Sequence, residues 1–212
     1  KINEACYLRL GELHRSLTGN SFPESFIKPE PTMNKLPVFS YFKAPVSNIV
    51  PSKSISILDA FKMIKGDMFL KNTKNLRNLT DKIEARKYKA ANFDYVTFSG
   101  TFSERNDKAL RKHSGLMAID FDHIPNLSEL KNNLLSDEYF ETEILFYSPS
   151  GDGLKWIIPI DLSKASHPDY FKAVAAYILQ CYQVKVDQSG KDISRACFLP
   201  YDPDVYINPK YW

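Results

Sequence analysis

The sequence has 212 residues, of which 43% are hydrophobic and 13% aromatic, and its formal net charge is +3. This composition predicts a folded core rather than a disordered chain, and no apolar run approaches the roughly 20 residues that a membrane-spanning helix needs. The three cysteines, Cys6, Cys181 and Cys197, lack CxxC or metal-ligand spacing, and their odd number argues against a disulfide framework. We therefore expect a cytoplasmic protein in a reducing compartment, with no membrane partner.

Basic and acidic residues are unevenly distributed along the chain. Residues 71–113 contain eleven Lys and Arg against five Asp and Glu, whereas residues 114–212 contain eight against fourteen. A basic half beside an acidic half suits a protein that binds a polyanion with one part and a cation with the other. Ordinary solvated helix faces would give the same counts, so charge alone leaves both interpretations open.

The N-terminal half divides into two predicted parts. Residues 1–35 combine apolar positions at helical spacing with a proline-rich stretch, which predicts a helical segment followed by a linker. Residues 36–113 predict an α/β unit. Its expected elements are a strand at 38–42, helices at 57–64 and 76–88, of which the second is strongly basic, and a strand at 93–98.

Residues 114–212 show the most regular pattern. In chain order they predict a strand at 116–122, a helix at 127–135 with Asn126 as its N-cap, strands at 143–148 and 154–160, a helix at 168–182, and short strands at 184–187 and 196–199. This order predicts an α+β fold with a ferredoxin-like or RRM-like β-α-β-β-α-β sheet, whose two helices lie on one face. We expect the other face to be open.

Two aspartates close the strand at 116–122. Asp120 and Asp122 are separated by one residue, so they point to the same side of the sheet, while the alternate residue Phe121 points into the core. That parity predicts that both carboxylates lie on the open face. Adjacent carboxylates repel each other, and such a pair often holds a divalent cation that handles phosphates. A strand end that runs into a polar turn would give the same DxD pattern.

The segment from Ser148 to Lys155 reads Ser-Pro-Ser-Gly-Asp-Gly-Leu-Lys and predicts a tight turn between two strands. Gly151 and Gly153 let backbone N–H groups approach phosphate oxygens, and Ser148 and Ser150 add hydroxyl donors. Strand alternation directs Lys155 to the open face, where its ammonium group could hold a phosphate. A plain hairpin turn accounts for the same residues, because Gly-Asp-Gly is good turn chemistry.

Three residues near the C-terminus complete the predicted site. If the last strand runs antiparallel beside the first, Asp187 approaches Asp122, and three carboxylates could then hold one or two Mg²⁺ or Mn²⁺ ions. Ser194 offers a hydroxyl donor and Arg195 a bidentate fork for phosphate, although Asp192 and Arg195 could instead pair across one turn. Carboxylates, a Gly-rich turn and two cations together predict metal-assisted transfer of a nucleotide to a 3′-hydroxyl.

Five motifs in this order resemble the archaeo-eukaryotic primase (primase-polymerase) superfamily. The closer resemblance is to its virulence-associated protein E (VirE) N-terminal domain branch, found in bacteria and mobile elements, and it covers about residues 36–205. The motifs are Thr97-Phe-Ser-Gly-Thr-Phe-Ser-Glu-Arg105, Ser114-Gly-Leu116, Ile119-Asp-Phe-Asp122, Ser148-Pro-Ser-Gly-Asp-Gly-Leu-Lys155 and Asp192-Ile-Ser-Arg-Ala-Cys-Phe-Leu-Pro200.

The resemblance implies roles for individual residues. Asp120, Asp122 and Asp187 would be the catalytic metal ligands. Ser150, Lys155 and Arg195 would contact the phosphates of the incoming nucleotide. It also implies that residues 36–113 pack beside a catalytic palm at 114–212, where Arg105 and the basic helix could face template or nucleotide. Many members of the superfamily have histidine in place of Lys155, and lysine cannot act as an imidazole acid or base.

We therefore expect a primase-polymerase that joins NTPs or dNTPs on a single-stranded DNA template with Mg²⁺ or Mn²⁺. A helicase module, C-terminal on the same polypeptide or on a separate chain, is the expected partner. In the first case this chain would be a segment of a longer protein. The alternative is a non-catalytic nucleotide- or nucleic-acid-binding module, which Lys155 favours. A Toprim enzyme needs an acidic residue on an earlier strand, and a replication-initiator endonuclease needs a His-x-His pair that is absent. His123 has the wrong strand parity for a metal ligand, and His167 is expected near a helix start or on the surface.

Overall fold

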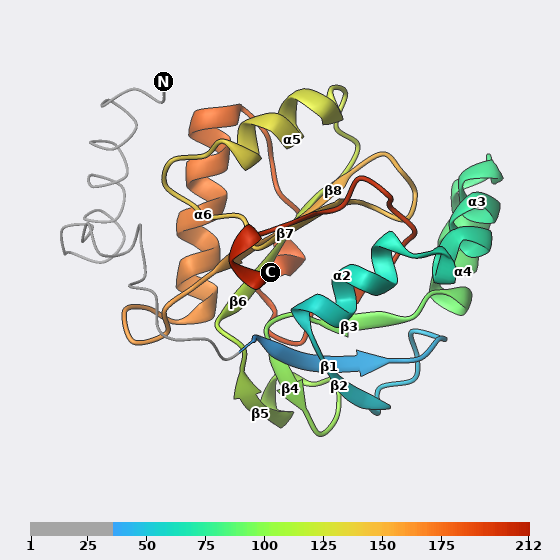
Figure 1. Cartoon of the computed structure of the whole chain (residues 1–212), viewed down its shortest axis with the longest axis horizontal. Coiled ribbons are helices and arrows are strands. Elements are labelled where there is room, and N and C mark those ends of the chain that lie inside the picture. Colours follow the sequence, from blue (N-terminus) through green and yellow to red (C-terminus); the bar gives the residue numbers. More distant parts are fainter. Residues whose placement is uncertain (1–35) are drawn as a thin grey trace.

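The computed structural model describes residues 36–212 and shows a mixed α+β fold with antiparallel sheets, in which five α-helices fall within these residues (Figure 1). The predicted helical segment and linker at 1–35 lie outside the described residues. Within residues 36–212, none of the helices has both the length and the apolar character needed to cross a membrane.

The first four-stranded sheet has the order β2-β1-β3-β9. Its strands are β1 (Val38–Phe42), β2 (Lys53–Ser56), β3 (Tyr95–Thr97) and β9 (Cys197–Phe198), and the helices that accompany it are α2 (Ile57–Lys65), α3 (Leu70–Asn78) and α4 (Lys82–Asn92). The strand at 38–42 is confirmed, as is α2, which begins with a capping box between Ser56 and Asp59. A separate hairpin pairs β4 (Gly100–Phe102) with β5 (Leu110–His113).

The single helix predicted at 76–88 is wrong. The chain forms two helices, α3 and α4, with a break at residues 79–81 (Figure 1). Leu79 is extended, with φ −78° and ψ 124°, and the Asp81 side chain accepts a hydrogen bond from the Glu84 N–H. Asp81 therefore caps a new helix, which satisfies an N–H group that an uninterrupted helix would have bonded internally.

The second four-stranded sheet has the order β10-β7-β8-β6. Its strands are β6 (Leu116–Phe121), β7 (Ile144–Tyr147), β8 (Leu154–Pro159) and β10 (Tyr206–Ile207), and its helices are α5 (Leu127–Leu135) and α6 (His167–Tyr182). The prediction for α5 is confirmed together with its cap, because the Asn126 side chain accepts from the Glu129 N–H. The antiparallel pairing of β8 with β6 places Lys155 directly opposite Asp120.

The strand predicted at 184–187 is wrong. The Asp187 N–H donates to the Asp120 carbonyl at 3.0 Å, so the chain does reach the edge of β6, but it then turns into a 3₁₀ helix at Gln188–Lys191. The Asp187 side chain accepts from the Ser189 N–H at 3.0 Å, and this local turn competes with strand pairing. The later strand, β9, is only two residues long and pairs with β3 in the other sheet.

Both faces of the β6-β8-β7 sheet are buried, so the predicted open face is wrong. One face packs against α5 and α6 through residues such as Ile119 and Trp156. On the other face Ala118 and Ile157 belong to a second core with Phe39 and Phe98 from the first sheet. Apolar residues on both faces need cover, and the N-terminal unit supplies it. The predicted polar residues are accessible only in a cleft between the two units.

Candidate functional site

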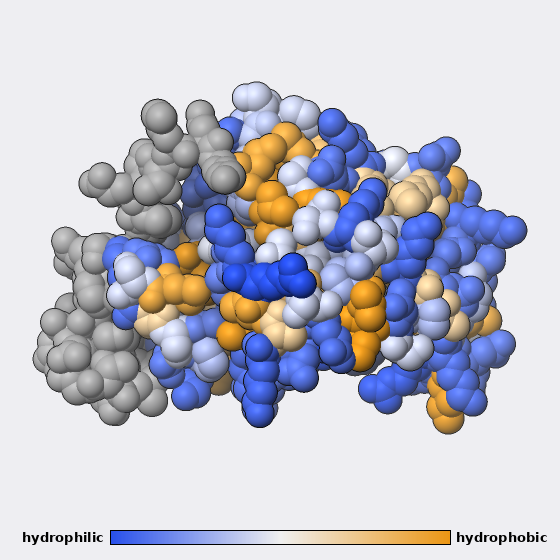
Figure 2. All heavy atoms as spheres, turned by 90° about the horizontal axis from the view of Figure 1, so that it is seen from below, coloured by the Kyte–Doolittle hydropathy of each residue, from blue (hydrophilic) through white to orange (hydrophobic). Residues whose placement is uncertain are grey.

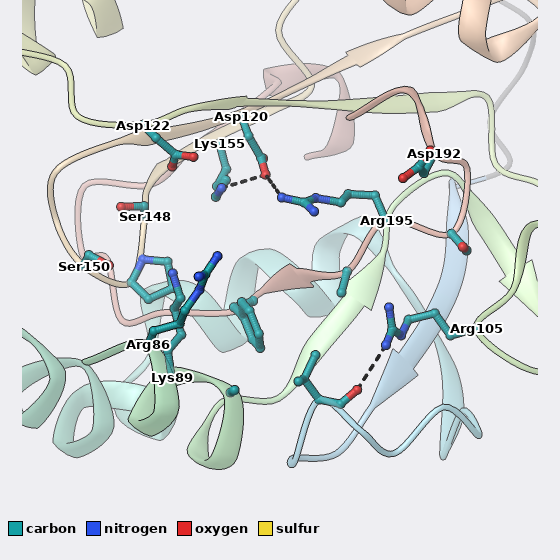
Figure 3. Close-up of a pocket in the computed structure, with 16 residues that line it drawn as sticks. Arg86, Lys89, Arg105, Asp120, Asp122, Ser148, Ser150, Lys155, Asp192 and Arg195 are labelled. Atoms are coloured by element: carbon teal, nitrogen blue, oxygen red, sulfur yellow. Dashed lines mark hydrogen bonds and ion pairs between the residues drawn. The ribbon is translucent and has the colours of Figure 1, made fainter. Parts of the chain in front are cut away.

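A cleft of about 410 Å³ lies where the second sheet meets α4 and β9 (Figure 3). The C-terminal half contributes most of one wall from β6, β8, the β7–β8 turn and the segment before β9, while α4 and the loop after β1 contribute the opposite wall. The lining residues are Val46, Arg86, Lys89, Ala90, Arg105, Asp120, Asp122, Ser148, Pro149, Ser150, Lys155, Asp192, Ser194, Arg195, Ala196 and Phe198.

Eight of the eleven residues predicted for the site line this one cleft. They are Arg105, Asp120, Asp122, Ser148, Ser150, Lys155, Ser194 and Arg195. The remaining three, Gly151, Gly153 and Asp187, do not line it. The structure therefore brings together residues from four separate stretches of the sequence.

An ion pair occupies the centre of the cleft. Lys155 Nζ lies 2.8 Å from Asp120 Oδ2, and both residues are buried, with 9% and 3% of their surfaces exposed. The pKa of Lys155 is raised, because burial, which disfavours its charge, is outweighed by the neighbouring carboxylate of Asp120. Strand alternation correctly placed both side chains on one face of the sheet, but that face is not open, and Lys155 pairs with Asp120 Oδ2.

Arg195 connects Asp120 with Asp187. Its Nη2 atom lies 2.7 Å from Asp187 Oδ2 and 3.6 Å from Asp120 Oδ2. The pKa of Asp187 is lowered: burial opposes its charge, but hydrogen bonds from Ser189 and the charge of Arg195 prevail. The alternative pairing of Asp192 with Arg195 is limited to a backbone bond, from the Arg195 N–H to the Asp192 carbonyl at 3.1 Å.

Two aspartates of the cleft can donate oxygen ligands to a divalent ion, but the predicted set of three carboxylates is not assembled. Within residues 36–212, no group of three His, Cys, Asp or Glu side chains is placed to hold a metal. However, Asp120 Oδ1 is buried without a hydrogen-bond partner, and the exposed Asp122 lines the same cleft. Mg²⁺ commonly binds through one or two carboxylates plus substrate phosphates and waters, so Asp120 and Asp122 fit such an ion. Asp187 is engaged by Arg195 and Ser189.

The β7–β8 turn owes its glycines to the path of the chain. Gly151 has φ +83°, and a Cβ on Gly153 would lie 2.1 Å from the Phe121 carbonyl oxygen, so larger residues are excluded at both positions. Arg77 from α3 holds the turn, because its Nε and Nη2 donate to the carbonyls of Pro149 and Ser148 at 3.2 and 3.3 Å. The glycines therefore shape the turn that presents Ser148 and Ser150.

Arg86 and Lys89 extend the predicted site. Both project from α4 into the cleft (Figure 3). Sequence reasoning marked their helix as basic without assigning either residue, and their spacing of three was the available signal. The pKa of Lys89 is lowered by burial and by the charge of Lys155. Arg105 also lines the cleft, but it donates to the Tyr95 hydroxyl and the Val46 carbonyl.

Two histidines, His113 and His167, lie next to each other and neither is exposed. His167 begins α6, as one of its two expected positions predicted, but it is 2% exposed and so does not lie on the surface. The Gly115 N–H donates to His113 Nδ1, and His113 Nε2 lies 3.2 Å from His167 Nδ1. His167 Nε2 in turn faces the Gly190 carbonyl at 3.4 Å, close to the turn that carries Asp187. Burial is the main reason that the pKa of His113 falls to about 4. His123 pairs with Asp152 at 2.6 Å and does not line the cleft.

Comparison with known proteins gives one match. The family model of the BT4734-like, N-terminal domain matches residues 88–207, which is more than half of the chain. No curated protein and no solved structure matches the sequence. The matched residues include every residue predicted for the site. They also include β3 and β9 of the first sheet and all four strands of the second sheet.

Proposed function

The chain belongs to the BT4734-like N-terminal domain family, and from its cleft we propose that it is a primase-polymerase-type nucleotidyl transferase. One observation carries the proposal: a single cleft of about 410 Å³ gathers three aspartates, five lysine or arginine side chains and three serines. That volume falls within the range of about 300–1,000 Å³ typical of small-molecule sites, so it can admit a nucleotide.

The proposed reaction assigns a task to each group. The 3′-hydroxyl oxygen of one nucleotide attacks the α-phosphorus of an NTP or dNTP, the bond to the β-phosphate breaks, and pyrophosphate leaves while the hydroxyl proton passes to solvent. Lys155 and Arg195 would bind phosphate oxygens, and Ser148 and Ser150 would donate hydrogen bonds to them. A Mg²⁺ or Mn²⁺ ion bound by Asp120 and Asp122 would supply neutralisation of the charge that develops on phosphate.

The arrangement of the second sheet supports a palm-like role. β6, β8 and β7 are neighbours in that order, and α5 and α6 cover one face, as in a ferredoxin-like sheet. The edge beyond β6 is reached by Asp187 through one backbone hydrogen bond rather than by a fourth strand. We propose that this sheet is the catalytic palm and that a single-stranded DNA template and a helicase module are its partners.

Synthesis on single-stranded DNA tests the proposal. Wild-type protein with Mg²⁺ or Mn²⁺ and labelled NTPs or dNTPs should form or extend an oligonucleotide, and Asp122→Asn should reduce the product at least 100-fold because a metal-binding carboxylate is lost. Asp204→Asn removes an exposed carboxylate outside the cleft and serves as the matched control. Absence of product from the wild type, or equal product from Asp122→Asn, would refute the transferase.

The ion pairs favour a second candidate function. Lys155 and Arg195 already neutralise Asp120 and Asp187, as expected of a binding module that has lost catalysis. Such a module would bind ATP or single-stranded DNA in EDTA and yield no product with either metal. Binding measured beside synthesis therefore separates the two functions.

A further inference from the structure

A row of basic side chains runs along α4. Lys82, Arg86 and Lys89 follow one another at spacings of four and three residues, so they lie on one face of the helix. At about 1.5 Å per residue, the row is about 10 Å long. Arg86 and Lys89 line the cleft, whereas Lys82 is exposed and does not line it. The row therefore leads from the interior of the cleft to its exterior.

An aromatic side chain adjoins the inner end of this row. Phe198 lines the cleft, and Lys89 Nζ lies 5.9 Å from the centre of its ring. Tyr95 meets the Phe198 ring edge-on at 6.1 Å, which supports the ring from one side. A positively charged groove with an aromatic platform is the usual construction for binding single-stranded nucleic acid, because bases stack and phosphates pair with cations.

The cations of the row form no ion pair with residues 36–212 of the protein. Among residues 36–212, neither Arg86 nor Lys89 forms an ion pair, in contrast to Lys155 and Arg195. The two helices α3 and α4 carry seven Lys and Arg against one acidic residue, Glu84, and the end of the molecule that they form is largely hydrophilic (right side of Figure 2). A polyanion would offset this excess of positive charge.

We propose that the α4 wall is a track for one strand of nucleic acid. Successive phosphates contact Lys82, Arg86 and Lys89, and one base stacks on Phe198. A nucleotide confined to the cleft would meet only Arg86 and Lys89, whereas a strand that leaves the cleft also meets Lys82. The inference deepens the proposed function, on which it rests for the use of the strand, but binding to the track needs neither metal nor nucleotide.

The test measures the binding of a fluorescein-labelled oligothymidylate of about 16 nucleotides in EDTA. Fluorescence anisotropy gives the affinity over a range of salt concentrations. Lys82→Gln should lower the slope of log affinity against log salt by about 0.7 and weaken binding about fivefold at 0.1 M salt. Phe198→Leu should weaken binding about tenfold with the slope unchanged, because stacking releases no counterions. Lys112→Gln on β5, away from α4 in Figure 1, is the matched control and should have no effect.

ATP separates a strand from a nucleotide as the occupant. Lys82→Gln should leave ATP affinity unchanged while it weakens oligonucleotide binding. An unchanged salt slope in Lys82→Gln, or an equal loss in Lys112→Gln, would overturn the track. Loss of ATP binding in Lys82→Gln would instead assign the row to the nucleotide. A protein that binds the oligonucleotide as described but synthesises nothing would retain the track and lose the proposed transferase.

Discussion

The buried ion pair between Asp120 and Lys155 leads to an asymmetric prediction. At 2.8 Å and an effective dielectric constant of about 20, their attraction is about 6 kcal/mol, and Arg195 at 3.6 Å adds about 5 kcal/mol for Asp120. Desolvation of the charges offsets most of this attraction, and removal of one partner of a buried pair typically costs about 3–5 kcal/mol. Asp120→Asn leaves Lys155 beside Arg195, a like charge. Lys155→Met leaves Asp120 with Arg195 as its remaining partner.

We therefore expect Asp120→Asn to lower the free energy of unfolding by about 4 kcal/mol and Lys155→Met by only about 2 kcal/mol. Urea unfolding followed by circular dichroism measures both values. The matched control is Asp152→Asn, which removes an exposed pair with His123 and should cost less than about 1 kcal/mol. A loss in Lys155→Met equal to or above that in Asp120→Asn would refute the reasoning.

The same pair predicts a dependence on pH. In the wild type the pKa of Lys155 is raised above its ordinary value of 10.5, so its stabilising contribution is complete below that value and declines as the pH rises through the folded-state pKa. In Asp120→Asn burial is no longer opposed, so the pKa of Lys155 should fall below its ordinary value. The unfolded chain then binds more protons than the folded one, and the penalty of the substitution should shrink as the pH rises from neutral towards 10.5.

Three further outcomes follow from the site. Asp187→Asn should raise ATP affinity in EDTA about three- to tenfold in isothermal titration, because Arg195 is released for phosphate, and unchanged affinity would contradict this. The pKa of His113 is depressed to about 4, so stability should fall as the pH drops from 6.5 to 4, and His113→Phe should flatten that slope in urea unfolding. Burial raises the pKa of the Cys197 thiol to about 12, so iodoacetamide at pH 8 should modify it only in concentrated guanidinium chloride, as read by mass spectrometry.

Local patterns in the sequence predicted most of the elements. Strand alternation identified β1 and β6, and the helix at 127–135 was predicted with its cap because apolar period and Asn126 agree. The break between α3 and α4 was missed although Asp81 and Glu84 have the spacing of an N-terminal cap, because no Gly or Pro interrupts the helical period there.

Contacts between distant segments were less accessible. Parity correctly placed Asp120 and Lys155 on one face, but their direct pairing depends on the register of β6 against β8, which no local pattern specifies. The cover over that face was missed for the same reason, since nothing in residues 114–212 indicates which apolar surface of residues 36–113 packs there. β9 is too short for a periodic signal, and only its pairing with β3 makes it a strand.

The segment from Asp187 to Phe198 begins beside β6 and ends beside β3, so it passes from one sheet to the other and carries Ser194 and Arg195 on the way. A polypeptide cut after residue 113 would separate β9 from its partner and bare Ala118 and Ile157 to water. Recombination with another protein at that boundary would therefore pair a new unit with a sheet that had lost its native core contacts and its β3–β9 pairing. The N-terminal unit and the sheet that carries Asp120 must be inherited, and engineered, as one exchangeable piece.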